Sequence, residues 1–283
     1  MTELLPADGV VPTRVPGFSM VRASRPGERQ PIIYEPCIYL VAQGRKCAYL
    51  DDEVFTYDAL HYLVLTVPLP LAAHVVMASE RQPYLAIRLE INLAQLNQLL
   101  IDMGDTDRLA ADHSNRGIFV SAMSEELAGA MYRLTQIVDD QQRAKVLGPT
   151  LNKEILYYVM CGEQGHLLRS FSQSNRHDHQ IASVIHFIQH NYYQPIEITD
   201  LAELANMSAS SLHHHFKTVT RLSPIQYIKS VRLHQAKRII CDDAHSISEA
   251  AFKVGYASPS QFSREYKRLF GVAPSETARQ QGQ

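Results

Sequence analysis

The stretch SISEAAFKVGYASPSQFSREYKRLFGVAP, residues 246–274, decides how the second half of this chain folds. It predicts two short helices joined by a tight turn. A serine at 246 or 248 suits the N-cap of the first helix. Gly255 follows that helix, where the left-handed backbone of a C-terminal turn favours glycine. Ser258 suits the second N-cap, and Pro259 stands at the first helical position, where a missing backbone donor is tolerated.

The second of these helices has two distinct faces. Apolar side chains recur three or four residues apart, which predicts one buried stripe: Phe262, Tyr266, Leu269 and Phe270. Another face carries short hydroxyls and long cations: Ser260, Ser263, Arg264 and Lys267. Base edges need donors and acceptors and phosphates need positive charge, so this face is typical of a recognition helix. Taken alone, the stretch fits an ordinary amphipathic hairpin with a solvated basic face equally well.

A second copy of the pattern lies upstream, in ITDLAELANMSASSLHHHFKTVTRLSP, residues 198–224. The expected N-caps are Thr199 or Asp200 and Ser208, and the expected inward residues are Leu201, Ala202, Ala205, Leu212, Phe216 and Val219. With Leu212 aligned on Phe262, the two copies are 50 residues apart (262 − 212). Two tandem helix-turn-helix units indicate a DNA-binding domain far more strongly than one does.

These repeats resemble the AraC/XylS family of bacterial transcription regulators over roughly residues 178–278. The residues that carry the resemblance are Asp200-Leu-Ala, Met207-Ser-x-Ser-x-Leu, Phe216-Lys, Ser223-Pro, Tyr227, Arg232-Leu, Ala236, Val254-Gly-Tyr and Phe262-Ser-Arg-Glu-Tyr-Lys-Arg-x-Phe-Gly with Pro274. The resemblance implies two units at the ends of a linker helix, each entering the major groove. Residues 225–241 form a run without a helix breaker that would span roughly 25 Å. That length is of the right order for two helices one DNA turn, about 34 Å, apart.

The expected DNA contacts lie on the two recognition helices. They are Ser210, His213, His214 and Lys217 in the first unit and Ser260, Ser263, Arg264 and Lys267 in the second. We expect Arg264 at a base edge and the two lysines at phosphates.

The first unit departs from the family pattern at two places. His214 stands where the family usually has arginine, and imidazole is mostly neutral at pH 7, so an assured phosphate or guanine contact is lost. Arg221-Leu222 replaces the usual glycine before Ser223, which leaves a glycine-dependent turn in question. We therefore expect the first unit to be the weaker or more adaptable reader.

The formal net charge is −2, but the charges are unevenly placed. Residues 1–160 hold 14 Lys and Arg against 19 Asp and Glu, whereas residues 161–283 hold 13 against 10. Between Leu204 and Cys241 no acid occurs, and six cations do: Lys217, Arg221, Lys229, Arg232, Lys237 and Arg238. This local footprint favours a nucleic-acid surface, although such runs elsewhere are often solvated helix faces.

Residues 18–91 show an alternating pattern with turn residues between short runs. Six β-branched or aromatic-rich runs begin at Cys37, Arg45, Val54, Tyr62, Ala72 and Tyr84. Their spacing predicts an antiparallel barrel or sandwich. The region resembles the cupin-like sensing domain of one AraC subgroup through Gln43-Gly-x-Lys, Phe55-x-Tyr-Asp, Tyr62-Leu-Val, Leu69-Pro and Pro83-Tyr-Leu-Ala-Ile-x-Leu. The expected fold class is α+β, a cupin-like β-barrel with following helices and a C-terminal all-α domain.

Beyond the strands the period becomes helical, with candidates at 93–103, 121–139 and 147–161. Their apolar faces either pack on the barrel or form a subunit interface, as helices after the barrel often do in AraC-type regulators. Prolines at 6, 12 and 16 predict a loosely ordered arm, and a polar stretch after Cys161 predicts a linker. The expected divisions are a flexible arm at 1–16, an effector-sensing domain at 17–161, a linker at 162–177 and a DNA-binding domain at 178–283.

The sequence offers little that points to an enzyme. A cupin metal site needs two histidines one residue apart on a strand, and the strand region holds only His61 and His74. Phosphate-loop, dinucleotide-binding and nucleophile-elbow patterns do not occur. The four cysteines form no Cys-x-x-Cys pair and read as small buried residues. Polar strand residues that a ligand would meet, depending on register, are Tyr39, Tyr49, Tyr57, His61 and Arg88.

These observations predict a cytoplasmic, dimeric transcription regulator that binds double-stranded DNA. We expect no catalysis, metal, cofactor, signal peptide or membrane segment. A small organic effector in the barrel is expected to modulate DNA binding, with RNA polymerase as a partner if the protein is an activator. The alternative is a cupin-type small-molecule enzyme or binding protein with a helical interaction module.

Overall fold

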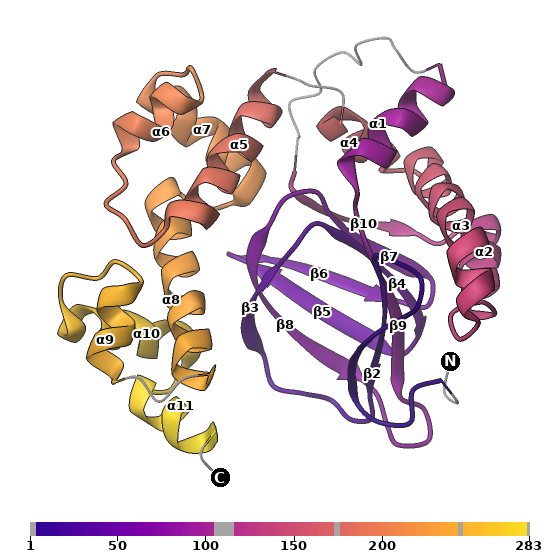
Figure 1. Ribbon diagram of the computed structural model, residues 1–283, viewed down its shortest axis with the longest axis horizontal. Coiled ribbons are helices and arrows are strands. Elements are labelled where there is room, and N and C mark those ends of the chain that lie inside the picture. Colours follow the sequence, from indigo (N-terminus) through magenta and orange to yellow (C-terminus); the bar gives the residue numbers. More distant parts are fainter. Residues whose placement is uncertain (1–3, 105–115, 173–175, 243–245, 282–283) are drawn as a thin grey trace. The chain divides into compact units, whose positions relative to one another are not determined.

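The computed structural model describes residues 4–104, 116–172, 176–242 and 246–281. The chain divides into an N-terminal unit, which holds most of the first 175 residues, and a C-terminal unit that contains everything from Arg176 onward. The strands precede this point and the helix-turn-helix elements follow it (Figure 1).

Two antiparallel sheets form the framework of the N-terminal unit. One has the order β1-β2-β9-β4-β7-β10 and the other the order β3-β8-β5-β6. The strands are β1 (Gly9–Pro12), β2 (Phe18–Ala23), β3 (Gln30–Tyr34), β4 (Cys37–Gln43), β5 (Arg45–Leu50), β6 (Glu53–Asp58), β7 (His61–Leu65), β8 (Leu69–Met77), β9 (Tyr84–Glu90) and β10 (Ile118–Ala122). All six runs expected from the alternating pattern are strands, and the α+β fold class is confirmed.

The two sheets do not close on each other, so the expected barrel is wrong in this respect. The described strands form two separate ladders, with β1 and β3 each at an edge. Pro12 in β1 and Pro31 in β3 have no backbone N–H to donate across such an edge. The result is an open sandwich.

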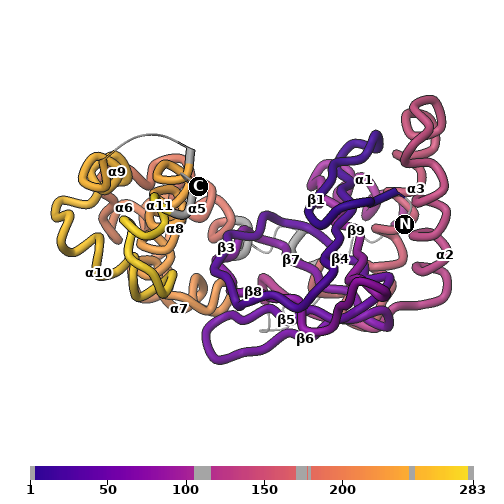
Figure 2. The backbone as a smooth tube through the Cα atoms, turned by 90° about the horizontal axis from the view of Figure 1, so that it is seen from below, coloured from indigo at the N-terminus to yellow at the C-terminus, as the bar shows by residue number. Residues whose placement is uncertain are grey.

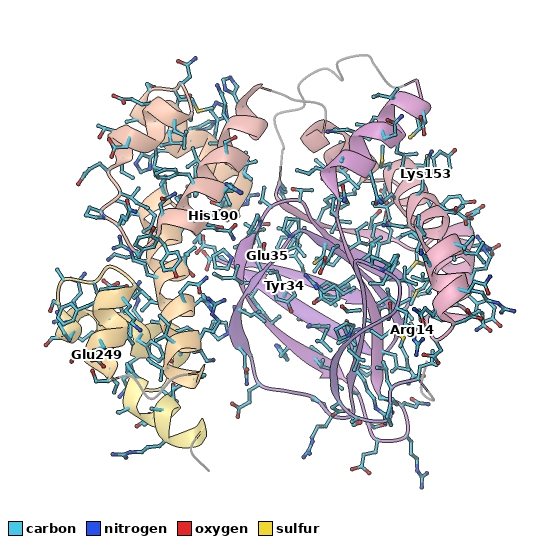
Figure 3. All side chains as sticks on the ribbon, viewed as in Figure 1. Arg14, Tyr34, Glu35, Lys153, His190 and Glu249 are labelled. Atoms are coloured by element: carbon cyan, nitrogen blue, oxygen red, sulfur yellow. The ribbon has the colours of Figure 1, made fainter. Side chains whose placement is uncertain are left out.

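Four helices cover one face of the six-stranded sheet (Figures 1 and 2). They are α1 (Leu93–Asp102), α2 (Glu125–Thr135), α3 (Gln141–Cys161) and α4 (Gly165–Ser172). Leu40 and Ile87 of the sheet belong to one buried cluster with Leu99 of α1 and Leu134 of α2. Lys153 of α3, which is labelled in Figure 3, also donates a hydrogen bond to Asp102 of α1. In this part of the chain, packing on the sheet accounts for the inward apolar faces of the helices.

The helix expected at 121–139 begins later than the sequence indicated. Residues Ile118–Ala122 form β10, which pairs with β7. Ser124 then caps α2, because its hydroxyl accepts a hydrogen bond from the backbone N–H of Leu127 at 3.2 Å. Partner strands distant in sequence, rather than local periodicity, determine this boundary.

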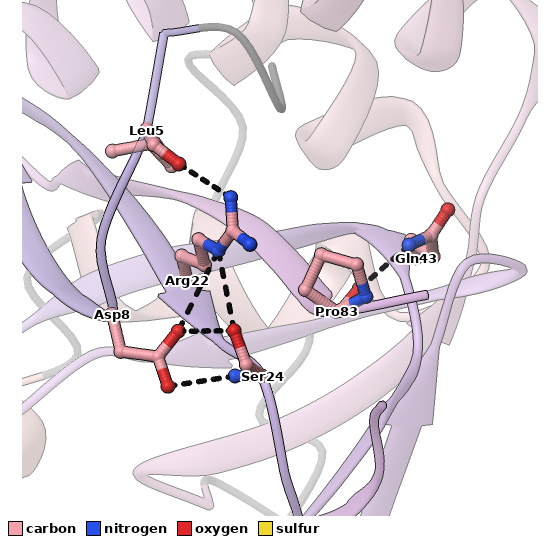
Figure 4. A network of polar contacts seen from close by, with 6 residues as sticks. All are labelled: Leu5, Asp8, Arg22, Ser24, Gln43 and Pro83. Atoms are coloured by element: carbon pink, nitrogen blue, oxygen red, sulfur yellow. Dashed lines mark hydrogen bonds and ion pairs between the residues drawn. The ribbon is translucent and has the colours of Figure 1, made fainter. Parts of the chain in front are cut away.

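The N-terminal arm, expected to be loosely ordered, is tied to the first sheet from residue 4 onward. β1 pairs with β2, and Leu5 is fully buried. The Arg22 guanidinium donates to the backbone carbonyl of Leu5 at 2.6 Å, and the Ser24 hydroxyl donates to Asp8 at 2.6 Å (Figure 4). The described part of the arm therefore forms an edge strand of the sheet.

The linker expected at 162–177 contains helix α4. Leu167 and Leu168 of this helix are buried in the same cluster as the sheet and α3. These two leucines provide the apolar face that the polar composition of the segment concealed. Residues 173–175, within the expected linker, lie outside the described part of the chain.

From Arg176 onward, the regular elements in the described residues are all helices. They are α5 (Arg176–Asn191), α6 (Ile198–Leu204), α7 (Ala209–Thr220), α8 (Pro224–Asp242), α9 (Ile247–Lys253), α10 (Pro259–Phe270) and α11 (Pro274–Gln281). α6 and α7 form one helix-turn-helix unit and α9 and α10 the other, and α8 connects them as the expected linker helix (Figure 1).

Candidate nucleic-acid interface

The second helix-turn-helix unit follows its sequence signals closely. Ser246 caps α9 in a capping box with Glu249, in which each side chain accepts a hydrogen bond from the backbone N–H of the other residue. Gly255 adopts a φ of +88°, and an added Cβ would lie 2.7 Å from the Tyr193 carbonyl oxygen. Ser258 caps α10 through the backbone N–H of Gln261. The turn thus requires glycine for both its conformation and its close approach to the turn that follows α5.

The apolar stripe of α10 anchors this helix in the unit. Phe262 and Tyr266 are fully buried, and their rings pack against each other with Tyr256 at the other side of Phe262. The hydroxyl of Tyr266 donates to Thr277 of α11 at 3.1 Å. One face of α10 is therefore committed to the core, which leaves the opposite face available.

The available face of α10 carries the predicted contact residues. Ser260, Arg264 and Lys267 are exposed, and Ser263 is half-buried beside them. Within the described part of the chain, the side chains of Arg264 and Lys267 make no hydrogen bond or ion pair. Two unpaired cations beside hydroxyls are suited to phosphates and base edges.

The recognition helix of the first unit, α7, has the same division of faces. Ser208 caps it through the backbone N–H of Ser211 at 3.2 Å, as expected. Its stripe of Leu212, Phe216 and Val219 is buried. The opposite face exposes the predicted contact residues, which are Ser210, His213, His214 and Lys217.

Two local details of the first unit differ from expectation. The N-cap of α6 is Glu197, without a side-chain cap, rather than Thr199 or Asp200. The turn after α7 adopts the left-handed conformation at Arg221, with a φ of +61°, where glycine was missing. The Thr220 hydroxyl supports this turn, because it donates to the Phe216 carbonyl at 2.7 Å and accepts from the Leu222 N–H at 3.2 Å.

The six-cation footprint is smaller than the sequence suggested. Lys229 pairs with Glu265 at 2.7 Å, an acid outside the acid-free span. Arg232 donates to the backbone carbonyls of Tyr192 and Gln194, at 2.7 and 2.8 Å. These two cations hold the unit together rather than form part of a free positive surface.

The N-terminal sandwich places polar side chains between its sheets. The Lys46 ammonium lies 5.4, 5.1 and 5.9 Å from the ring centroids of Tyr34, Tyr39 and Tyr84. The hydroxyls of Tyr57 and Tyr84 are buried and find no hydrogen-bond partner in the described structure. Burial raises the pKa of both phenols well above the ordinary value, so they remain neutral. Of this group, the sequence analysis considered Tyr39 and Tyr57 and overlooked Lys46. The available signal was that Lys46 directly follows Arg45 on a strand, so the two side chains point to opposite faces of the sheet.

The other candidate polar residues of the strands have partners elsewhere. His61 bonds to Asp58 at 2.9 Å, and the Tyr49 ring stacks on His74. Arg88 donates to Glu90 at 3.1 Å. Among the described residues, no group of three or more His, Cys, Asp or Glu side chains is arranged to hold a metal ion.

The family comparison agrees with this architecture. The AraC-type transcriptional regulator N-terminus matches residues 14–167, and a helix-turn-helix domain family matches residues 201–280. The chain belongs to the AraC-type transcriptional regulators. It is accordingly a DNA-binding transcription regulator, and the relatives it matches are regulators rather than enzymes.

Individual relatives show how far the similarity extends. The thermoregulatory protein LcrF of Yersinia pestis is 22% identical over 243 residues, which are 84% of this chain and 87% of the relative. The Msm operon regulatory protein of Streptococcus mutans is 31% identical over 111 residues, 39% of each chain. ToxT from Vibrio cholerae has a similar fold, with a TM-score of 0.61 at 12% identity over 92% of this chain and 97% of its own. No helix in the described ranges is both long and apolar enough to span a membrane.

Proposed function

We propose that this protein reads an operator through α7 and α10, with Arg264 as its main base contact. The carrying observation is that Arg264 is exposed and unpaired among the described residues, on a helix whose other face is held in the core by Phe262 and Tyr266. An arginine in that position can donate two hydrogen bonds to guanine. Ser210, Ser260 and Ser263 supply shorter polar contacts beside the longer side chains.

The remaining contacts divide by chemistry. Lys217 and Lys267 are exposed near the C-terminal ends of α7 and α10, where phosphate contact needs charge rather than geometry. His213 and His214 take the positions beside the groove in the first unit. The first unit thus presents imidazoles where the second has a guanidinium.

Arg264→Ala in the full-length chain tests this assignment. The probe is a duplex that the wild-type chain selects from a randomised pool, compared with a scrambled duplex. We expect a loss of about 1–3 kcal/mol on the selected duplex only. The matched change Lys267→Ala should weaken both duplexes alike and lower the salt slope by about one. Equal losses for Arg264→Ala on both duplexes would remove its role in reading bases.

The protein acts, in this proposal, as a cytoplasmic homodimeric activator that contacts RNA polymerase. The supporting observation is that relatives spanning most of the chain carry the name transcriptional activator, as VirF of Yersinia enterocolitica does at 22% identity. The sensing domain then extends through α4 to residue 172, and the DNA-binding domain begins with α5.

The effector site is proposed to lie inside the sandwich, at Lys46 and the neighbouring tyrosines. A lysine without a carboxylate partner among the described residues, beside the unsatisfied phenols of Tyr57 and Tyr84, favours an organic anion. Solved structures of ToxT contain an unsaturated fatty acid and a naphthalenyl butenoic acid, both of which are carboxylic acids. The aromatic rings around Lys46 suit the apolar part of such a molecule.

Thermal unfolding of the full chain with those two acids tests the effector class. The acids should raise the melting temperature, and their uncharged methyl esters should not, because the ester lacks the charge that pairs with Lys46. Lys46→Met should abolish the shift, whereas Lys153→Met, on α3, should preserve it. Equal shifts by acids and esters would contradict an anionic effector.

A further inference from the structure

A carboxylate stands in the middle of the second recognition helix, directly after Arg264. Glutamate can itself read DNA, because it accepts a hydrogen bond from the amino group of cytosine. Both oxygens of Glu265 are already engaged, however. One accepts from Lys229 at 2.7 Å and from Gln261 at 3.1 Å, and the other accepts from the Tyr256 hydroxyl at 2.7 Å. A base edge would have to displace these donors.

The donors come from three different parts of the unit. Lys229 lies on α8, Tyr256 lies in the turn between α9 and α10, and Gln261 lies one turn earlier on α10. We call Lys229, Tyr256, Gln261 and Glu265 the Glu265 cluster. It joins the recognition helix both to the linker helix and to the turn that precedes it.

The Glu265 cluster is partly shielded from water. The side chains of Glu265 and Lys229 are 21% and 43% exposed. Burial by itself would raise the pKa of Glu265, but the hydrogen bonds from Lys229, Gln261 and Tyr256 outweigh it and leave that pKa below the ordinary value. Charge-assisted bonds in such surroundings are stronger and more directional than exposed ion pairs.

The same stretch of α8 also holds α5. Arg232, three residues after Lys229, bonds the carbonyls of Tyr192 and Gln194 at the end of α5. Gly255 packs against the Tyr193 carbonyl at that point, with Arg232 beside it. Successive residues of one α8 face therefore fix α5 and α10 to the same helix.

We propose that Lys229 and Glu265 are positioning residues, which set the angle of α10 against α8 and so the placement of the second recognition helix in its groove. Glu265 is then not a base contact, and Lys229 is not a phosphate contact. The inference rests on the proposed role of α10 in reading DNA.

The test uses the full-length chain and the duplex that the wild type selects from a randomised pool. Glu265→Gln and Lys229→Met should each lower affinity for this duplex roughly tenfold, and the double variant should lose little more, because one interaction is removed in all three. Hydroxyl-radical protection should weaken over one half of the duplex and persist over the other. The exchanged pair, Lys229→Glu with Glu265→Lys, should recover part of the loss.

Other roles give different outcomes. If Glu265 reads a base, Glu265→Gln relaxes preference at one base pair while Lys229→Met leaves that preference unchanged, and the proposal fails. If Lys229 contacts a phosphate, Lys229→Met lowers the salt slope by about one and its loss adds to that of Glu265→Gln, which also overturns it. Arg238→Met is the matched control, since it removes an exposed cation of α8 outside the Glu265 cluster.

A second measurement needs no DNA. Amide hydrogen exchange of the full chain should become faster in α10, and not in α7, in both single variants. Unchanged exchange in α10 would refute the positioning role. Arg264→Ala separates this result from the proposed function: it leaves the Glu265 cluster intact, so failure of the base-reading role would not alter the exchange result.

Discussion

The two helix-turn-helix units share a core but attach their recognition helices differently. Leu212 and Phe262, which are 50 residues apart (262 − 212) and equivalent in the repeat, are both fully buried. The residue three positions later is His215 in one unit and Glu265 in the other. Glu265 pairs with Lys229 of α8, whereas the His215 ring stacks on His177 of α5, with centroids 4.5 Å apart.

This difference shows that the apolar positions specify the helix-turn-helix motif, whereas the polar positions determine how each recognition helix is attached to its neighbouring helix. The second unit is held by charge-assisted hydrogen bonds, which constrain direction. The first relies on two stacked imidazoles, and the pKa of His215 is lowered by burial first and then by His177 and His214. Protonation would weaken this contact, so we expect the first unit to be the more adaptable of the two.

The largest expected effect concerns what the units share. Phe216→Ala and Phe262→Ala should each lower the free energy of unfolding of the C-terminal unit by roughly 3–5 kcal/mol, because each leaves a cavity in a packed core. Urea unfolding of the full chain, with hydrogen exchange to locate the affected helices, measures the loss. Phe252→Ala is the control, since that side chain is 57% exposed and should cost little. An unchanged transition for Phe262→Ala would refute its place in the core.

A smaller expected effect is the dependence of the stability of the second unit on pH. His234 of α8 packs edge-on against Phe270 of the second unit, and burial, reinforced by Lys237, lowers its pKa to about 4. Because the folded-state pKa lies below the ordinary 6.5, this contribution to stability is complete above pH 6.5 and is lost as the pH falls toward 4. The full loss is about 3 kcal/mol.

Replacing His234 by leucine isolates that contribution. The variant should lose less stability than the wild type between pH 6.5 and 4, as measured by urea unfolding at each pH. Gln235→Leu, the neighbouring position on α8, removes no titratable group and should leave the pH dependence unchanged. If the wild type and His234→Leu lose stability in parallel, another group is responsible.

A third prediction concerns DNA binding by the first helix-turn-helix unit. His214→Arg restores a permanent cation to the exposed face of α7 and should strengthen DNA binding by about 1 kcal/mol or less, with a salt slope steeper by about one. Titration of the selected duplex over a salt series measures both. His190→Arg adds the same charge on α5 and serves as the control. Equal gains from both variants would indicate general electrostatic attraction rather than a contact made by α7.

Local signals predicted much of both units and of the sheets. The N-caps at Ser208 and Ser258, the buried stripes and the linker helix all depend on residues within a turn or two of one another, which is why the sequence reveals them. The six alternating runs became strands for the same reason. The exposed placement of Arg264 followed from the stripe on the opposite face of its helix.

Features that depend on distant partners were missed. Burial of Leu5 needs Arg22 and the pairing of β1 with β2, and β10 needs β7 as its neighbour. From the sequence alone, Lys229 was interpreted as a free cation, because its partner Glu265 is 36 residues away. The inward position of Lys46 depends on strand register, which one residue of slip would reverse.

The smallest expected effect tests the turn that ends each recognition helix. Arg221 and Gly271 are equivalent, 50 residues apart (271 − 221), and both adopt the left-handed conformation, with φ of +61° and +78°. A side chain there costs roughly 1 kcal/mol, so Arg221→Gly should stabilise the first unit by about 0.5–1 kcal/mol in urea unfolding.

Gly271→Ala provides the reciprocal change. Apart from its chain neighbours, no heavy atom of the described residues lies within 4 Å of an added Cβ at this position, so its expected loss of about 1 kcal/mol would arise from the backbone alone. If Arg221→Gly instead lowers stability while Gly271→Ala behaves as expected, the side-chain interactions of Arg221 outweigh its strained backbone. The arginine would then stabilise the first unit directly. Its side-chain contacts would be a second example of polar interactions that distinguish the two units, whose apolar core is shared.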